Sequence, residues 1–262
     1  MEPFEIAHVA ALHAYNLPFR PNIRMAFQPI IDTQSWQIFA YEALVRGENG
    51  EGAGWVLEQV TPENQYSFDQ KCRIHAVYTA AQLGMTQKLS INFLPNAVYH
   101  PEASIQRTLD AAKKSNFAIS NIIFEITEVE KILDIARLRH IIEEYRAQGF
   151  MTAIDDFGAG YSGLGLLAEL QPDILKIDMS LVRGVDLDPV RRSIIRGIMA
   201  VADELNTEVI AEGIETRDEF AALHDTGIHL FQGYYFAHPR LESLSGIETL
   251  PMHVKRHPAG HR

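Results

Sequence analysis

The sequence predicts an α/β fold, a TIM-like (β/α)8 barrel that is irregular because its first two strands should form an antiparallel pair. The length of 262 residues is close to the roughly 250 residues of a single such barrel. From residue 25 onward, short apolar runs rich in β-branched and aromatic residues alternate with longer segments of helical period. Only residues 32–37 separate the first two runs, which is too short for a parallel crossover. An open doubly wound sheet is the alternative fold.

Eight runs have the length and composition of strands. They are residues 25–31, 38–45, 89–93, 122–126, 151–154, 174–177 and 208–211, and a weaker run around Leu230. Eight strands with helices after most of them favour one closed barrel over two domains. We therefore expect residues 22–245 to form the barrel domain, after a lead-in segment of residues 1–21 and before a tail of residues 246–262.

Several helix ends can be read between these runs. Thr61 and Pro62 predict a cap and a proline at the first position of a helix that stops near Gly84. Pro101, after His100, opens the next helix in the same way.

Further along the chain, Thr127 with Glu130 and Thr216 with Glu219 have the spacing of capping boxes. Apolar residues recur at helical spacing over residues 132–145, and Gly149 follows where a left-handed C-cap is expected.

A later helix begins at Asp188-Pro189, where an aspartate cap precedes a proline at the first helical position. Its apolar residues share one face, and they are Val190, Ile194, Ile198, Val201 and Leu205.

Composition limits the partners and the compartment. The formal net charge of -11 predicts a surface that repels DNA, RNA and anionic membranes. The single cysteine, Cys72, excludes an intrachain disulfide and fits a reducing compartment. We find no secretory leader and no run of ~18 apolar residues, so we expect a cytoplasmic protein without membrane insertion.

Polar residues fall within or at the end of nearly every strand-like run. They are Glu42, Asn92, Glu125, Asp155, Asp156, Lys176, Glu212 and Gln232. In a barrel, the C-terminal strand ends meet on one face, so these residues should share one pocket. Taken singly, each could be a cap or a solvated loop residue, but such a convergence is hard to obtain by chance. By the period of two, Arg46 should point to the same side as Glu42.

The charges of this set predict bound cations. Glu42, Glu125, Asp155, Asp156 and Glu212 bring five negative charges and Lys176 brings one positive charge, so two divalent cations would make the sum zero. Clustered buried carboxylates need such partners to stay ionised. Carboxylate oxygens with one amide suit Mg²⁺ or Mn²⁺ rather than zinc.

Eight motifs, in order along the chain, resemble those of the EAL family of cyclic di-GMP phosphodiesterases. They are Phe27-Gln28-Pro29-Ile30, Tyr41-Glu42-Ala43-Leu44-Val45-Arg46-Gly47, Asn92 within its strand, Phe124-Glu125-Ile126-Thr127-Glu128, Asp155-Asp156-Phe157-Gly158, Leu175-Lys176-Ile177-Asp178 and Ala211-Glu212-Gly213-Ile214-Glu215, followed by Gln232-Gly233-Tyr234. The resemblance covers residues 22–240. One departure is Phe93-Leu94-Pro95, where many members carry a leucine and a serine after the asparagine.

The resemblance implies a role for each matching position. Glu42, Asn92, Glu125 and Asp155 would hold one metal, and Asp155 and Asp156 the second, with Glu212 supporting the second metal or its water. Lys176 would position the attacking water, Glu128 would anchor the loop after Asp156, and Gln28, Arg46 and Gln232 would contact the substrate.

The resulting hypothesis is hydrolysis of one phosphodiester bond of cyclic di-GMP to linear 5'-pGpG by a two-metal mechanism, with Lys176, Glu212 and Asp156 as catalytic residues. We expect Mg²⁺ or Mn²⁺ to support turnover, Ca²⁺ to inhibit it, and the chain to form a homodimer. Two alternatives remain open. One is a catalytically silent cyclic di-GMP receptor, and the other is a metal-assisted barrel enzyme that uses Lys176 as a base for proton abstraction.

Overall fold

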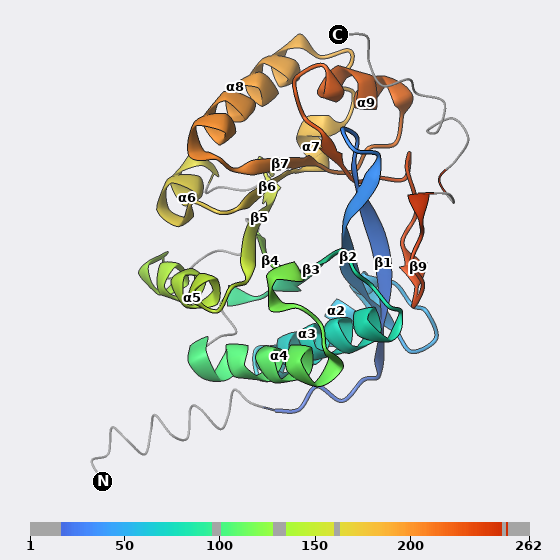
Figure 1. Cartoon of the computed structure of the whole chain (residues 1–262), viewed down its shortest axis with the longest axis vertical. Coiled ribbons are helices and arrows are strands. Elements are labelled where there is room, and N and C mark those ends of the chain that lie inside the picture. The colour runs from blue at the N-terminus through green and yellow to red at the C-terminus, as the bar shows by residue number, and fades with distance from the viewer. Residues whose placement is uncertain (1–16, 96–100, 128–134, 160–162, 248–249, 251–262) are drawn as a thin grey trace.

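The computed structural model describes residues 17–95, 101–127, 135–159, 163–247 and 250. Within these residues, eight strands form a closed ring with helices outside it, which confirms the predicted barrel (Figure 1). The ring consists of β1 (Ile23–Asp32), β2 (Gln37–Gly47), β3 (Lys88–Phe93), β4 (Ile122–Thr127), β5 (Met151–Phe157), β6 (Ile174–Ile177), β7 (Glu208–Ala211) and β8 (Leu230–Phe231). The helices are α2 (Ala53–Leu57), α3 (Gln65–Gln82), α4 (Pro101–Ser115), α5 (Ile135–Ala147), α6 (Gly163–Leu170), α7 (Met179–Val182), α8 (Pro189–Leu205) and α9 (Arg217–His224), with the 3₁₀ turn η2 (Ile119–Asn121).

The first strand runs opposite to the rest of the ring. β1 is antiparallel to both of its neighbours, β2 and β8, while the pairs from β2 to β8 are parallel. The short connection between β1 and β2 leaves room only for a hairpin, so the predicted antiparallel start is confirmed.

Several elements differ from the sequence prediction. The short elements α2, α6, α7 and β9 (Arg240–Leu241) were not predicted individually, and β9 extends the sheet beyond the ring by pairing with β1 at Ala26 and Phe27. Helix α3 begins at Gln65 rather than at the Thr61-Pro62 pair. The reason is local, since the Asn64 side chain accepts the Thr61 N–H at 2.8 Å and residues 62–64 form a turn.

Other predicted helix ends are confirmed. Thr216 and Glu219 form a reciprocal capping box at the start of α9, and Asp188 caps α8 with Pro189 behind it. Gly149 has a φ of +91° and lies two residues after Ala147, the last residue of α5. The predicted box of Thr127 and Glu130 is not tested, because Glu130 lies outside the described residues.

A layer of apolar side chains fills the middle of the ring. Seven strands each contribute buried residues to it, and they are Ile30, Ala40, Ile123, Ala153, Ile174, Ile210 and Leu230. Side chains from so many strands can meet only inside the barrel, which makes its interior a packed core. A second, larger cluster lies between the strands and the surrounding helices.

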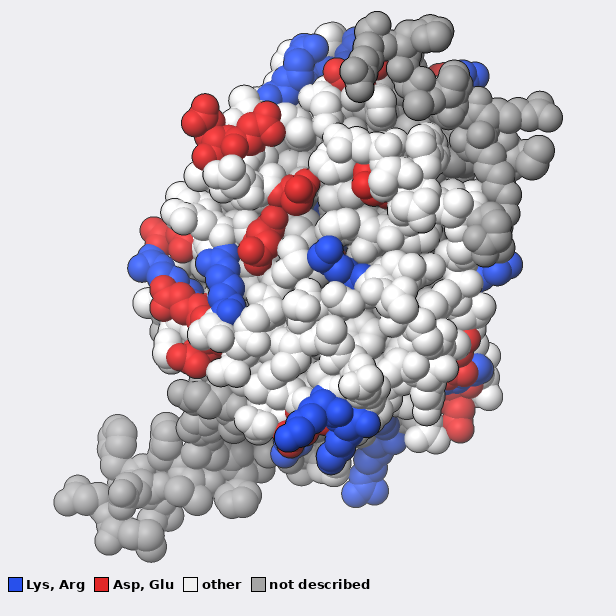
Figure 2. All heavy atoms as spheres, in the orientation of Figure 1, with Lys and Arg blue, Asp and Glu red and all other residues white. Residues whose placement is uncertain are grey.

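The surface carries charges of both signs. On the face shown in Figure 2, acidic and basic side chains lie in small groups separated by uncharged surface. In the part of the chain that the structure describes, no helix is long and apolar enough to cross a membrane.

Candidate active site

The polar site lies directly above the apolar layer of the barrel. Glu42, Glu125, Asp155, Lys176, Glu212 and Gln232 each follow a residue of that layer by two positions, on β2 and β4 to β8 or just beyond their ends. Because side chains alternate along a strand, residues two apart point to the same side. Strand β1 runs in the opposite direction. Its polar residue at this level, Gln28, therefore comes two positions before Ile30 of the apolar layer. The sequence therefore places a polar layer on a dry apolar floor at the C-terminal end of the parallel strands.

Lys176 is the centre of this layer. Its side chain is 1% exposed, and its Nζ lies 2.7 Å from Glu212, 2.8 Å from Glu125, 3.0 Å from Asp155 and 3.6 Å from Glu42. Burial alone would lower the pKa of Lys176, but the carboxylates, Asp155 first among them, raise this pKa well above its ordinary value. The raised pKa favours the protonated form of Lys176, which contacts four carboxylates.

Two overlapping groups of carboxylates could each hold a metal ion. One is Glu42, Glu125 and Asp155 and the other is Asp155, Asp156 and Glu212, with ligand atoms within 4.8 Å of one another in each group. The two groups share Asp155, as expected for a residue that bridges two cations.

The polar atoms around the first group fit a cation. Asn92 pairs in register with Glu125, and its Nδ2 donates to Glu42 Oε1 at 3.1 Å, so its amide joins the group. The Ser90 hydroxyl donates to Glu125 Oε1, whereas Glu125 Oε2 is buried and accepts no hydrogen bond from the described residues. A buried carboxylate oxygen without a partner is costly, and a divalent cation would satisfy it.

The raised pKa values of the carboxylates also indicate that the site has too little positive charge for its carboxylates. Burial raises the pKa of Glu125 to about 8, against the lowering effect of Lys176. Burial and then the charge of Asp155 raise the pKa of Asp156 to about 6, and the same two causes raise the pKa of Glu212 well above its ordinary range. One lysine does not neutralise this cluster, and added cations would favour the ionised carboxylates.

The strand that carries the paired aspartates is strained. Asp156 has a φ of +55°, and the pairing of β5 with β6 shifts register between Ile154 and Phe157. Without this irregularity, two adjacent strand residues would point to opposite sides. The left-handed backbone at Asp156 allows the carboxylates of Asp155 and Asp156 to reach one site. Such a backbone conformation costs about 1–3 kcal/mol of conformational free energy.

Two buried amides orient Glu42. Gln232 Nε2 donates to Glu42 Oε2 at 2.7 Å and to Gln28 Oε1 at 3.2 Å, and Gln28 Nε2 donates to the Ala237 carbonyl at 3.1 Å. Both side chains were predicted to contact substrate, and both line the cavity described next. Their hydrogen bonds also fix the carboxylate of Glu42.

A cavity of about 370 Å³ opens above the second carboxylate group. Its lining includes Glu42, Asp156 and Glu212 together with residues beyond the predicted set, which are Asp178, Met179, Arg183, Glu215 and Tyr234. Arg183 brings a cation to this rim and forms ion pairs with Glu215 and Glu219, and Tyr234 is 53% exposed. The cavity thus combines a carboxylate floor with a wall that carries one ion-paired arginine, two further carboxylates and an aromatic ring.

The structure does not bring one predicted site residue, Arg46, to the cluster. The Arg46 side chain is half-buried, and its Nη1 donates to the Val45 carbonyl at 2.7 Å, so the guanidinium turns to its own backbone and does not line the cavity. Glu128 lies outside the described residues. Conversely, the sequence analysis missed Ser90, although its spacing of two from Asn92 places it on the inner face of β3.

Comparison with known proteins identifies the family. Residues 16–239 match the EAL domain, and the chain therefore belongs to the EAL family. A standalone versatile EAL protein from Vibrio cholerae O395, in its c-di-GMP bound form, is 50% identical with a TM-score of 0.85, over 89% of this chain and 97% of that chain. Klebsiella pneumoniae BlrP1, in a manganese and cyclic diGMP complex at pH 6, is 33% identical with a TM-score of 0.82, over 88% of this chain and 59% of that chain.

Two curated relatives come from Escherichia coli (strain K12). The blue light- and temperature-regulated antirepressor BluF is 33% identical over 227 residues, which are 86% of this chain and 56% of BluF. The probable cyclic di-GMP phosphodiesterase PdeD is 29% identical over 246 residues, or 86% of this chain and 45% of PdeD. The chain thus spans about half the length of these curated relatives.

Proposed function

We propose that this chain hydrolyses one phosphodiester bond of cyclic di-GMP to linear 5'-pGpG. The observation that carries the proposal is the pair of overlapping carboxylate groups around Lys176 at the mouth of the barrel. Its support from comparison is that similar EAL structures hold this dinucleotide and that PdeD bears the corresponding name.

The donor set indicates which residues would hold two divalent cations. Glu42, Asn92, Glu125 and Asp155 would hold one, and Asp155, Asp156 and Glu212 the other. When bound, the two cations would offset charge on the phosphoryl oxygens and lower the pKa of the attacking water. Oxygen ligands of this kind suit Mg²⁺ or Mn²⁺.

The side chains of this chain then orient the reaction. Lys176 would use its three N–H groups to hold Glu125, Asp155 and Glu212 in place, and it would position the attacking water with one of them once a carboxylate turns away to bind a cation. Glu212 and Asp156 face the cavity and would accept hydrogen bonds from that water. Hydrolysis consumes one water, whose hydroxyl oxygen bonds to phosphorus while the departing ribose oxygen gains the proton.

The cavity wall would bind the rest of the dinucleotide. Gln28 and Gln232 present amides at its edge, and Tyr234 offers an aromatic face on which a guanine could stack. Arg46 would reach a phosphate only after its side chain leaves the Val45 carbonyl.

The test is incubation of the chain with cyclic di-GMP and Mn²⁺, followed by chromatography of the products. We expect linear 5'-pGpG with Mn²⁺ or Mg²⁺ and none with EDTA or in the Glu42→Ala variant. Ca²⁺ should slow turnover, because its larger radius and looser geometry misplace the reacting groups. Product formation at equal rates with EDTA and with Mn²⁺ would contradict the mechanism.

The alternative is a receptor that binds cyclic di-GMP without hydrolysing it, and similarity to the antirepressor BluF keeps this function in view. The same incubation separates the two functions. A receptor would retain cyclic di-GMP at equilibrium, even with saturating Mn²⁺, and release no linear product.

We also propose that the chain forms a homodimer through α8. The buried residues of this helix, Ile195, Ile198 and Ala202, face the barrel. Of the predicted apolar stripe only Ile198 is among them, so the rest of the stripe faces away from the barrel. The exposed members are Val190, Ile194, Val201 and Leu205, with Leu187 just before the helix. A continuous apolar face of this kind indicates an interface.

A further inference from the structure

A charged pair is completely buried on α3, outside the barrel. Asp69 is 2% exposed and Arg73 is 0% exposed, and their Oδ2 and Nη2 atoms lie 2.6 Å apart. The guanidinium carbon of Arg73 lies 5.6 Å from the ring centroid of Phe93 and 5.7 Å from that of Phe124. These two rings adjoin Asn92 and Glu125 in sequence and therefore point to the opposite side of strands β3 and β4. The pair thus lies directly behind the first carboxylate group.

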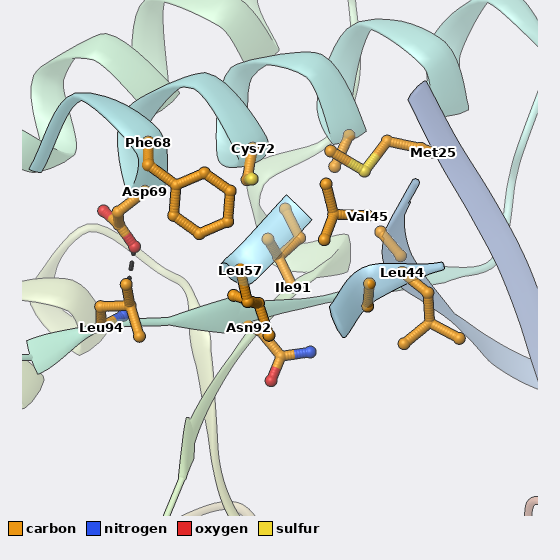
Figure 3. A pocket seen from close by; sticks show the side chains of 13 residues that line it. Met25, Leu44, Val45, Leu57, Phe68, Asp69, Cys72, Ile91, Asn92 and Leu94 are labelled. Carbon is orange, nitrogen blue, oxygen red and sulfur yellow. Dashed lines mark hydrogen bonds between the residues drawn. The ribbon is translucent and has the colours of Figure 1, made fainter. Parts of the chain in front are cut away.

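Asp69 ties α3 to the end of β3. Its Oδ1 accepts the Leu94 N–H at 3.1 Å, a hydrogen bond drawn in Figure 3. The pairing of β3 with β4 ends at Phe93 and Ile126, so Leu94 is the first residue beyond the ladder. In the described part of the chain, strand β4 offers no acceptor for the Leu94 N–H, and Asp69 supplies one instead. Leu94 lies two residues after Asn92.

Apolar packing alone does not fix this end of the strand. A cavity of about 290 Å³ lies beside α3 and the end of β3, and residues of β1, β2 and α2 complete its lining (Figure 3). Its lining from α3 and the end of β3 includes Ile91, Asn92, Leu94, Phe68, Asp69 and Cys72. Because a void removes the dispersion contacts across it, the hydrogen bond from Leu94 to Asp69 is a directed contact between α3 and the end of β3, beside the contact of Arg73 with the Phe93 ring.

Asp69 is itself held in one place. Arg73 donates to the Ser104 hydroxyl at 2.7 Å and to the Tyr145 hydroxyl at 3.2 Å, which anchors it to α4 and α5. A buried ion pair is weak grounds for stability, because well-packed apolar residues often replace it without loss. Apolar residues could not accept the Leu94 N–H, whereas the ion pair holds Asp69 Oδ1 in place to accept it.

We propose that Asp69 is a positioning residue for the metal site, acting through the Leu94 amide to hold the Asn92 side chain beside Glu42. The inference rests on the proposed metal-dependent function. Asn92 is exposed, and in the described part of the chain its side chain makes one hydrogen bond, to Glu42 Oε1. The position of its amide therefore depends on this hydrogen bond and on where the backbone places the side chain, and Asp69 holds that backbone through the Leu94 amide.

The experiment uses two variants that separate positioning from stability. Asp69→Asn keeps a carbonyl oxygen for the Leu94 N–H but leaves Arg73 without its counter-charge. The double variant Asp69→Leu/Arg73→Met removes both charges and the acceptor together. Tyr145→Phe is the control, since it removes a hydrogen bond of the same network without touching Leu94.

Mn²⁺ affinity is measured by titration without cyclic di-GMP, alongside the Tm of each metal-free protein. We expect the double variant to keep a Tm near that of the wild type and to bind one of two Mn²⁺ ions roughly 10–100-fold more weakly. Asp69→Asn should show the reverse, with a lower Tm and nearly wild-type Mn²⁺ affinity. Tyr145→Phe should retain both Mn²⁺ affinities.

Wild-type Mn²⁺ affinity in the double variant would overturn the proposal, as would losses of affinity that follow Tm across all the variants. If the double variant does not fold, Leu94→Pro replaces it, because this variant removes the N–H that donates to Asp69. Leu94→Pro should weaken the same Mn²⁺ site, and an unchanged Mn²⁺ affinity in Leu94→Pro would also overturn the proposal. A wild-type protein that binds Mn²⁺ but does not hydrolyse cyclic di-GMP would defeat the proposed function alone. A wild-type protein that binds no Mn²⁺ would defeat both.

Discussion

At the scale of single residues, Lys176 is the cation that contacts most of the carboxylates of the site. It lies in β6 between apolar residues, with four carboxylates within 3.6 Å of its Nζ. A buried lysine without such partners would lose its proton, and buried carboxylates without a cation would take protons up. The remaining distinction is whether Lys176 acts on the attacking water or only balances charge.

Lys176→Met tests this distinction. If Lys176 positions the water, kcat should fall by on the order of 10²-fold or more while the Kd for cyclic di-GMP changes little. If it only balances charge, its loss should weaken metal binding, and excess Mn²⁺ should restore the rate. The measurement is kcat and substrate Kd across a Mn²⁺ titration, and full rescue by metal would contradict the water-positioning role.

Proton affinities at the site predict how metal and pH act on stability. The folded-state pKa of Glu125, about 8, exceeds its unfolded value near 4.3, so the folded state holds its proton more tightly. Without metal, the free energy of unfolding should therefore fall as pH rises through that window. Mn²⁺ competes with these protons, so it should raise the Tm more at about pH 8 than at about pH 6.

The measurement is a thermal unfolding series at both pH values, with Mn²⁺ and with EDTA. The Glu42→Ala variant is the control, because it removes one ligand and should reduce the Mn²⁺-dependent rise in Tm. An equal rise at both pH values would show that protons and Mn²⁺ do not share these carboxylates.

At the scale of elements, the short helix α7 packs closely against two loops of the site. A Cβ added to Gly213, next to Glu212, would lie 2.6 Å from the Met179 Cβ, and one added to Gly158 would lie 2.4 Å from the Leu181 Cδ1. Both glycines have positive φ, +65° and +101°. The backbone that carries the second carboxylate group is thus shaped by glycines that let α7 approach.

Gly213→Ala should therefore lower the free energy of unfolding by about 1–3 kcal/mol, because alanine is strained at positive φ and its methyl meets Met179. Denaturant unfolding of the metal-free protein measures it. Gly165→Ala is the matched control, since an added Cβ there has open space within α6 and should be neutral or slightly stabilising. Equal stability in the two variants would show that α7 yields to the methyl group.

Particular residues show what could be predicted from the sequence. Period-two alternation and the convergence of strand ends placed Glu42, Glu125 and Lys176 correctly in one cluster, because both follow from covalent geometry and closure of the ring. The side chain of Arg46 could not be placed this way, because alternation fixes a side but not a rotamer. Strand β9 is too short for a local signal and forms only through its contact with β1.

At the scale of the whole molecule, the closed ring removes exposed sheet edges apart from β9 and leaves the helices to make outside contacts. Among the exposed large apolar residues of the described chain, Leu187 is 84% exposed and Val190 is 65% exposed, and both belong to the α8 stripe. In Figure 1, α8 lies on the outer side of the ring near β6 and β7. The stripe is therefore accessible to a second copy of the chain.

Ile194→Asp should convert the proposed homodimer to a monomer, because it places a charge in the middle of the apolar stripe, where burial against a second copy would leave it unpaired. Light scattering after size-exclusion chromatography measures the mass of each species. Leu17→Asp is the control, since Leu17 is 54% exposed and far from α8 in the chain, and it should leave the dimer intact. A wild-type monomer at high concentration, or an unchanged dimer in Ile194→Asp, would rule out α8 as the interface.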